Sequence, residues 1–364
     1  MSRLTCAAAW MHLVSNGCTM PRKDDDLKIL LKYLSEQPED LPFSRLYAFS
    51  DLAREKLAGF YTIWDTFPAS QRRRLVHALV ELAEASFEVN FDAIFRHCLA
   101  DPDEEVRRAA IDGLWENEDV ALIGPLLGML RNDPSAPVRA AAASGLGRYV
   151  LAGELEQLES PIQARIMTEL MTTLHLESES IEVRRRAIES ASYACTPDIM
   201  DALETAYDDA DEKMRLSAVV GMGRSCDRRW TDIILAEVNN PSAAMRYEAA
   251  LACGGLSLRQ AVPSLTELLD DSDQQVRDAA IWALGQIGGG QAKQALLAAY
   301  ENADDETRAI MDEALAEQAL LEGELEFTLY ELEDVDDDLS EDELFTIWSD
   351  DQEDDDLDED DWEL

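Results

Sequence analysis

A chain of 364 residues with a formal net charge of −45, from 76 acidic and 31 basic residues, repels phosphate backbones, so nucleic acid is not an expected partner. Apolar residues make up 46% of the chain, enough for a continuous core, but no apolar segment reaches the length that spans a bilayer, and we expect no membrane partner. The six cysteines form no CxxC pair, which is typical of reduced thiols in a cytoplasmic protein.

Residues 1–26 are predicted to be a disordered or non-native extension. Ala7–Val14 is a poor match to the apolar part of a secretion signal, because His12 lies inside it and no convincing cleavage site follows. Translation from Met20 would begin directly before an amphipathic segment. The native start is therefore either Met1 or Met20.

Residues 27–66 are predicted to form an irregular helical N-terminal cap, with helices over Leu27–Leu34 and Ser50–Trp64. Prolines 38 and 42 separate these two helices. Aromatic residues concentrate here, and they predict either the packed core of an irregular cap or a binding patch. They are Phe43, Tyr47, Phe49, Phe60, Tyr61, Trp64 and Phe67.

Residues 67–321 contain a repeat that is marked by regularly spaced arginines, which we call the register arginines. Arg184, Arg215, Arg246, Arg277 and Arg308 stand 31 positions apart, and each lies in a similar phrase. The series extends backwards to Arg139 and Arg107, and more weakly to Arg73. A fixed period of this length is typical of one supersecondary unit that is stacked many times.

Each unit is predicted to be a pair of helices. Asp, Asn or Ser stands six positions before each register arginine from Arg107 onward and is expected to be the N-cap of the first helix, with Pro102, Pro134 and Pro241 at the first helical position. Apolar residues one before, three after and seven after the arginine predict an inward stripe. Glycines 147, 223, 254 and 285 are expected to end these helices as left-handed C-caps, before a second amphipathic helix.

The phrases DPDEEVRRAAIDGL (101–114), DPSAPVRAAAASGLG (133–147) and DSDQQVRDAAIWALGQIG (271–288) resemble short HEAT-like repeats of the phycobilisome-lyase type. This resemblance implies an all-α, right-handed α-solenoid of about seven to eight helical hairpins. It also implies that the Arg and Asp columns form a ladder between neighbouring units, which is a structural role.

The spacing between Arg139 and Arg184 is 45 residues, 14 more than the strict period. The additional residues include LAGELEQLESP (151–161), which precede a second helix over Ile162–His175. Such an insertion is expected to form a loop on one face. It is either a binding element or a solvent-exposed spacer.

Residues 322–364 are predicted to be an acidic, largely disordered tail, because residues 331–364 hold 20 acids and no Lys or Arg. The tail is either a solvating end or a docking peptide that is anchored by Phe345, Trp348 and Trp362. Its basic counterpart would belong to a partner or to this chain. The candidate basic residues of this chain include Arg184, Arg185, Arg186, Arg228 and Arg229.

Catalysis is not predicted. The histidines, His12, His77, His97 and His175, are not followed by Glu, so the His-Glu pairs of the HEAT-like iron hydroxylases are missing. We assign no catalytic, cofactor-binding or metal-binding residue. The leading interpretation is a non-catalytic scaffold or adaptor that binds a protein with a basic surface. The alternative is a chromophore-handling or chaperone-like protein similar to the phycobilin lyases. The sequence leaves the oligomeric state open.

If the tail docks on the solenoid of its own chain, deletion of residues 331–364 should increase amide hydrogen exchange on the surface that it covers. Hydrogen exchange of the full chain and of the shortened chain measures this. Unchanged exchange throughout the solenoid would contradict docking in cis.

Overall fold

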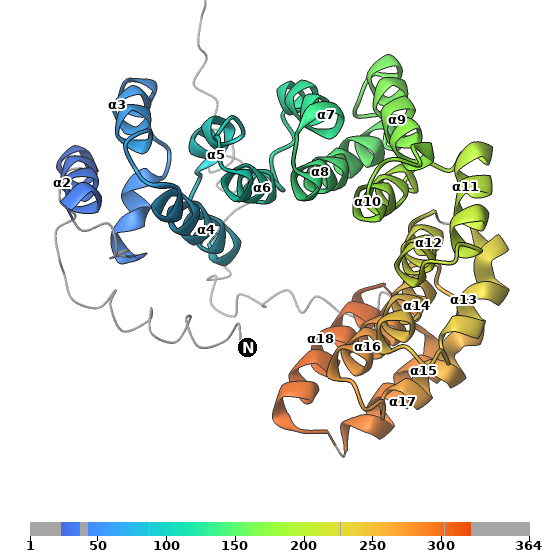
Figure 1. Cartoon of the computed structure of the whole chain (residues 1–364). Coiled ribbons are helices and arrows are strands. Elements are labelled where there is room, and N and C mark those ends of the chain that lie inside the picture. Colours follow the sequence, from blue (N-terminus) through green and yellow to red (C-terminus); the bar gives the residue numbers. More distant parts are fainter. Residues whose placement is uncertain (1–22, 37–42, 87, 226, 302, 322–364) are drawn as a thin grey trace, which may run out of the picture. The chain divides into compact units, whose positions relative to one another are not determined.

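The computed structural model describes residues 23–36, 43–86, 88–225, 227–301 and 303–321, and the regular elements in these ranges are all helices (Figure 1). The chain divides into two units, residues 1–318 and 319–364. The tail residues Phe345, Trp348 and Trp362 lie outside the described residues. No helix in the described ranges has the length and apolar character needed to cross a membrane.

Two kinds of helix alternate along the chain (Figure 1). We call the first kind register helices, because they carry the register arginines; they are α4 (Ala69–Ala85), α6 (Glu104–Gly113), α8 (Ala136–Glu154), α10 (Ile181–Ala191), α12 (Glu212–Arg224), α14 (Ala243–Gly255), α16 (Gln274–Ile287) and α18 (Asp305–Leu321). The second helices are α5 (Asp92–Cys98), α7 (Ile123–Asn132), α9 (Ser160–His175), α11 (Pro197–Tyr207), α13 (Thr231–Glu237), α15 (Val262–Leu268) and α17 (Gly289–Tyr300).

These helices form seven consecutive hairpins, from α4/α5 to α16/α17, followed by α18 in the described chain. From α4 to α16, each register helix packs against the next register helix. Short 3₁₀ turns precede three of the second helices: η2 (Val120–Leu122) before α7, η3 (Arg228–Trp230) before α13 and η4 (Arg259–Ala261) before α15. The predicted all-helical solenoid of seven to eight hairpins is confirmed.

The predicted inward stripe of the register helices is confirmed. In α6 it consists of Val106, Ala110 and Leu114, which are all buried. The equivalent residues of α8, α10, α12, α14 and α16 are also buried. Alanine in the middle of the stripe allows neighbouring helices to pack closely, because its side chain is only a methyl group.

The predicted N-caps are wrong by two residues. The helices begin three residues after the Asp, Asn or Ser column, and the actual caps are Asp103, Ser135, Ser180, Asp211, Ser242 and Asp273. Asp103, for example, accepts from the backbone N–H groups of Glu105 and Val106. The earlier residue, Asp101, instead accepts from the N–H of Asp103 at 2.9 Å and so shapes the turn before the helix. Pro102 therefore lies in the turn rather than at the first helical position.

The predicted glycine C-caps are also wrong. Gly147 and Gly285 lie inside helices that continue beyond them, and Gly223 and Gly254 are the penultimate residues of α12 and α14. These glycines are needed because the next register helix packs against their backbone. A Cβ atom at Gly223 would lie 2.8 Å from Cβ of Ala252, and one at Gly254 would lie 2.9 Å from Cα of Ala283.

The cap before α4 is built from α2 (Lys23–Glu36), the 3₁₀ helix η1 (Phe43–Phe49) and α3 (Arg54–Trp64). Phe49, Phe60, Trp64 and Phe67 are buried, and the rings of Phe49 and Phe60 meet edge to face at 5.2 Å. The indole N–H of Trp64 donates to Asp101 at 2.9 Å. Four of the aromatic residues that suggested a binding patch are therefore core residues that fix the cap on the first repeats.

The additional residues between Arg139 and Arg184 do not form a long loop. They lengthen α8 to 19 residues and α9 to 16 residues, and only residues 155–159 connect the two helices. The predicted loop over 151–161 is therefore mostly helical. Its effect is to extend α8 beyond the end of α6.

Replacement of Gly223 by Ala should lower the free energy of unfolding by about 1–3 kcal/mol, because the new methyl group overlaps Ala252. Gly128→Ala is the matched control. Nothing lies within 4 Å of the added Cβ in the middle of α7, so this variant should gain up to about 1 kcal/mol from helix propensity. Urea unfolding followed by circular dichroism measures both. Equal effects of the two variants would show that glycine at 223 has no packing role.

Candidate protein-binding surface

Among the register arginines, Arg107, Arg139 and Arg246 join consecutive turns of the array. Nη1 of Arg107 donates to the carbonyl oxygen of Asp101 in its own turn at 2.9 Å. Its Nε and Nη2 donate to the two carboxylate oxygens of Asp133, in the next turn, at 2.7 and 2.8 Å. Arg246 makes the same three contacts, to Asn240 and to Asp271. The predicted ladder is confirmed at these positions.

Two rungs use residues that the spacing did not predict. Arg139 pairs bidentately with Glu179 at 2.7 and 2.8 Å, because Ser178 occupies the expected column. In α4 the register role belongs to Arg72 rather than to Arg73. Arg72 donates to the carbonyl oxygen of Phe67 and to Asp101, and Arg73 instead pairs with the helix cap Asp103.

These contacts lower the pKa of two ladder carboxylates and so favour their charged form. The Arg246 guanidinium, together with the backbone N–H of Asp273, lowers the pKa of Asp271, and Arg139 with the backbone N–H of Ser180 lowers the pKa of Glu179 in the same way. The register arginines therefore carry structural bonds, which leaves other parts of the surface to bind ligands.

Three of the arginines predicted to face an acidic peptide lie at α10, where the chain already engages them. Nε of Arg184 donates to the carbonyl oxygen of Leu174 at 2.8 Å. Arg185 contacts Ser217 and Glu182, each at 2.9 Å. Arg186 donates to Glu189 at 2.7 Å. An acidic peptide would have to compete with these contacts, so their role in docking stays a proposal.

The centre of this cluster is Glu189, whose side chain is buried between Arg186 and Ser217. Burial raises the pKa of Glu248 on α14, and the negative charge of nearby Glu189 also raises it. Because Glu189 and Arg185 of α10 both bind Ser217 of α12, the cluster joins α10 to α12.

The other two predicted arginines, Arg228 and Arg229, lie in η3. Nε of Arg229 donates to Asp227 at 2.7 Å, although the Arg229 side chain is half exposed. Arg228 is also exposed. The five arginines thus come from α10 and from the turn before α13, and the structure does not place them in one continuous contact network.

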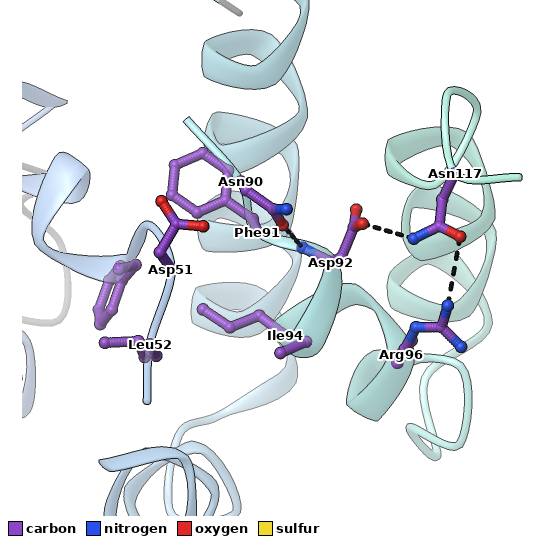
Figure 2. Close-up of a pocket in the computed structure, with 10 residues that line it drawn as sticks. Asp51, Leu52, Asn90, Phe91, Asp92, Ile94, Arg96 and Asn117 are labelled. Atoms are coloured by element: carbon purple, nitrogen blue, oxygen red, sulfur yellow. Dashed lines mark hydrogen bonds between the residues drawn. The ribbon is translucent and has the colours of Figure 1, made fainter. Parts of the chain in front are cut away.

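A cavity of 340 Å³ lies between the end of η1, the start of α5 and the turn after α6 (Figure 2). Asp92, Asn117 and Arg96 point toward one another in it: Asn117 donates to Asp92, and Arg96 donates to Asn117 at 3.2 Å. The backbone N–H of Asp51, which has a positive φ of 51°, donates to the carbonyl oxygen of Asn90 at 2.9 Å. These polar groups satisfy one another and connect the cap to α5 and α6.

The histidines in the described ranges have ordinary helix neighbours. His97 stacks on the ring of Tyr61 at 3.9 Å, and burial lowers its pKa. His77 lies 3.3 Å from Glu105. A search of the described residues finds no group of three or more His, Cys, Asp or Glu side chains that could hold a metal ion.

Large apolar side chains are exposed mainly around the lengthened α8. Nine such side chains are exposed in the described ranges, and five of them lie between residues 115 and 176: Trp115, Val120, Leu151, Leu155 and Leu176. Trp115 is 57% exposed, Leu151 39% and Leu155 58%. This concentration makes the end of α6 and the extension of α8 the candidate binding surface.

Trp115 was not predicted as a binding residue, although its position in the repeat indicates that it cannot pack as the equivalent residues do. Trp115 stands eight positions after Arg107, in the column where Gly147, Gly223, Gly254 and Gly285 allow close packing. An indole ring does not fit in such a contact. In the structure α6 ends at Gly113, before this position, and Trp115 is exposed.

Comparison with known proteins identifies the repeat. A family model described as HEAT repeats matches residues 91–173 and 231–316. Among the curated protein sequences, none matches this chain.

Three solved structures are similar to this chain at low sequence identity. The complex of CpcE and CpcF of phycocyanin lyase from Nostoc sp. PCC7120 is 17% identical, with a TM-score of 0.43 over 61% of this chain and 94% of that chain. Human deoxyhypusine hydroxylase is 18% identical, with a TM-score of 0.33 over 70% and 92%. A designed armadillo repeat protein in complex with the peptide (KR)4 is 21% identical, with a TM-score of 0.37 over 54% and 99%.

Replacement of Asp271 by Asn should lower the free energy of unfolding at pH 7 by about 1–3 kcal/mol, because Arg246 loses a charged partner while the turn acceptor is kept. The pKa of Asp271 is lowered in the folded state, so its contribution is present above the ordinary carboxyl pKa and is lost as the pH falls. Urea unfolding of both proteins should therefore show a difference at pH 7 that closes below about pH 4. A difference that does not depend on pH would contradict the ionic rung.

Proposed function

Because this chain is a HEAT-repeat protein, we propose that it is a non-catalytic scaffold whose solenoid surface binds a protein partner with a basic surface. The observation that carries the proposal is the set of exposed apolar side chains around α6 and α8 on a chain of net charge −45. Contiguous exposed apolar groups with a charged rim are typical of protein-binding surfaces.

The use of charged residues supports the same proposal. Arg107 and Arg246 bind turn carbonyl groups and ladder carboxylates, and Arg185 and Arg186 bind Glu182 and Glu189. These residues hold the array of helices in place. A rigid array with exposed apolar groups suits recognition, since little side-chain order is lost when a partner binds.

We also propose that the acidic tail is a second binding element. Its carboxylates would attract a basic surface, and Phe345, Trp348 and Trp362 would anchor it. The partner surface would lie on another protein, or on this chain at Arg228 and Arg229, the more exposed of the candidate arginines.

Crosslinked capture from the native cell tests the scaffold function. The full chain should enrich at least one protein over a control, and a chain that ends at Leu321 should keep the partners of the solenoid and lose those of the tail. A full chain with Phe345, Trp348 and Trp362 replaced by Ser is the matched control, because it keeps the tail charge. If neither the full nor the shortened chain enriches a protein, the scaffold function is wrong.

A further inference from the structure

The exposed residues Trp115, Leu151 and Leu155 form one surface, which we call the α6–α8 patch. Arg148 connects its two parts, because its Nη1 atom donates to the carbonyl oxygen of Trp115 at 2.8 Å. Leu151 and Leu155 follow Arg148 by three and seven positions, and residues at this spacing share one face of a helix. The patch therefore combines the segment after α6 with the extension of α8.

Neighbouring contacts define the limits of the patch. On one side, Tyr149 donates to the carbonyl oxygen of Asp119 at 2.9 Å and holds the turn after α6 against α8. On the other side, a Cβ atom at Gly147, one turn before Leu151, would lie 3.3 Å from the ring of Tyr193. Arg224 lies over that ring at 5.0 Å and donates to the carbonyl oxygen of Glu189.

The chain around the patch is acidic. Residues 109–130 hold four acids, residues 149–164 hold three, and neither segment contains Lys, Arg or His. Glu116, Glu118, Glu154 and Glu156 are exposed beside the apolar side chains. The Arg148 guanidinium is directed inward, where its Nε and Nη2 atoms are buried, and the Arg96 guanidinium pairs with Asp119, so neither neutralises these four glutamates. The rim therefore carries negative charge.

We propose that the α6–α8 patch binds a basic amphipathic helix of the protein partner. Leu151 and Leu155 form a ridge with four-residue spacing, which packs well against apolar side chains at the same spacing on another helix. Lysine or arginine residues that flank the apolar face of that helix would meet the exposed glutamates. This proposal rests on the scaffold function and specifies the surface and the chemistry of its partner.

Charge decides against the other occupants of this surface. The tail of this chain has 20 acids and no Lys or Arg in residues 331–364, so the rim repels it. A second copy would bring two acidic rims together in a symmetric contact, which is also unfavourable. The lengthened α8 supplies the ridge, which gives the 14 additional residues a function.

The test uses a fluorescent synthetic peptide of leucine and lysine with its leucines at helical spacing, and the full chain. Fluorescence anisotropy should show at least about tenfold weaker binding to the double variant Leu151→Ser and Leu155→Ser than to the unchanged chain. Both substitutions preserve net charge, so the general attraction of a lysine peptide to an acidic protein is equal in the two proteins. Leu297→Ser, at a 51% exposed leucine of α17, is the matched control and should bind within about twofold of the unchanged chain.

A second peptide of the same composition, with its leucines distributed around the helix, separates recognition from charge. The unchanged chain should prefer the amphipathic peptide, and hydrogen exchange should show protection at residues 148–155 when that peptide is bound. This measurement is independent of whether the double variant folds. Equal binding of both peptides, equal effects of the patch and control variants, or protection elsewhere would overturn the proposal.

The outcomes distinguish this inference from the scaffold function. If capture from the cell finds a partner whose crosslinks map away from α6 and α8, the scaffold function stands and the patch assignment is wrong. Self-association that the double variant abolishes would assign the patch to a second copy. If, without any peptide, removal of residues 322–364 increased hydrogen exchange at residues 148–155, the patch would be assigned to the tail. Either result overturns the proposal.

Discussion

The bridge that Arg107, Arg139 and Arg246 each make between two turns is the interaction that fixes neighbouring repeats at these positions of the array. One guanidinium binds the carbonyl oxygen of its own turn and both carboxylate oxygens of the next turn, as Arg107 does with Asp101 and Asp133. The same aspartate accepts from the backbone N–H that leads into its helix. A helix start, a turn and a contact between repeats are thereby fixed together, and planar bidentate geometry makes Arg the side chain suited to this role.

The glycine column meets a second requirement of the same contact. If consecutive turns are held by the ladder, the helices that follow must approach each other closely, and at Gly223 and Gly254 there is no room for a methyl group. These glycines cost helix propensity, which the contact between neighbouring helices offsets. Trp115 and Ser192 are the residues of this column between α6 and α16 that are not glycine, and of these Trp115 is the bulky one. It is compatible with the ladder only because α6 ends before it, and that early ending leaves the indole ring exposed.

The sequence predicted the repeat, the inward stripe and part of the ladder, because these depend on periodic positions that tertiary contacts reinforce. It misplaced the helix starts, because each phrase holds two side chains that can act as caps, such as Asp101 and Asp103. In the folded chain Asp101 accepts from the backbone N–H of Asp103, whereas Asp103 accepts from those of Glu105 and Val106 at the helix start, and the sequence alone does not distinguish these two roles. It misassigned Gly147 and Gly223 because a glycine that permits close packing and a glycine that ends a helix look alike in one sequence.

The candidate surface was only partly predictable for a related reason. The long interval after Arg139 indicated a departure from the repeat, but whether added residues become a loop or lengthen two helices depends on what supports them. Tyr149 supports the extended α8 through the carbonyl groups of Asn117 and Asp119, which belong to the preceding repeat. The extension continues beyond the end of α6, so no register helix covers Leu151 and Leu155. Their exposure therefore follows from a difference in length between neighbouring helices, and the surrounding acids determine which kind of partner such a ridge attracts.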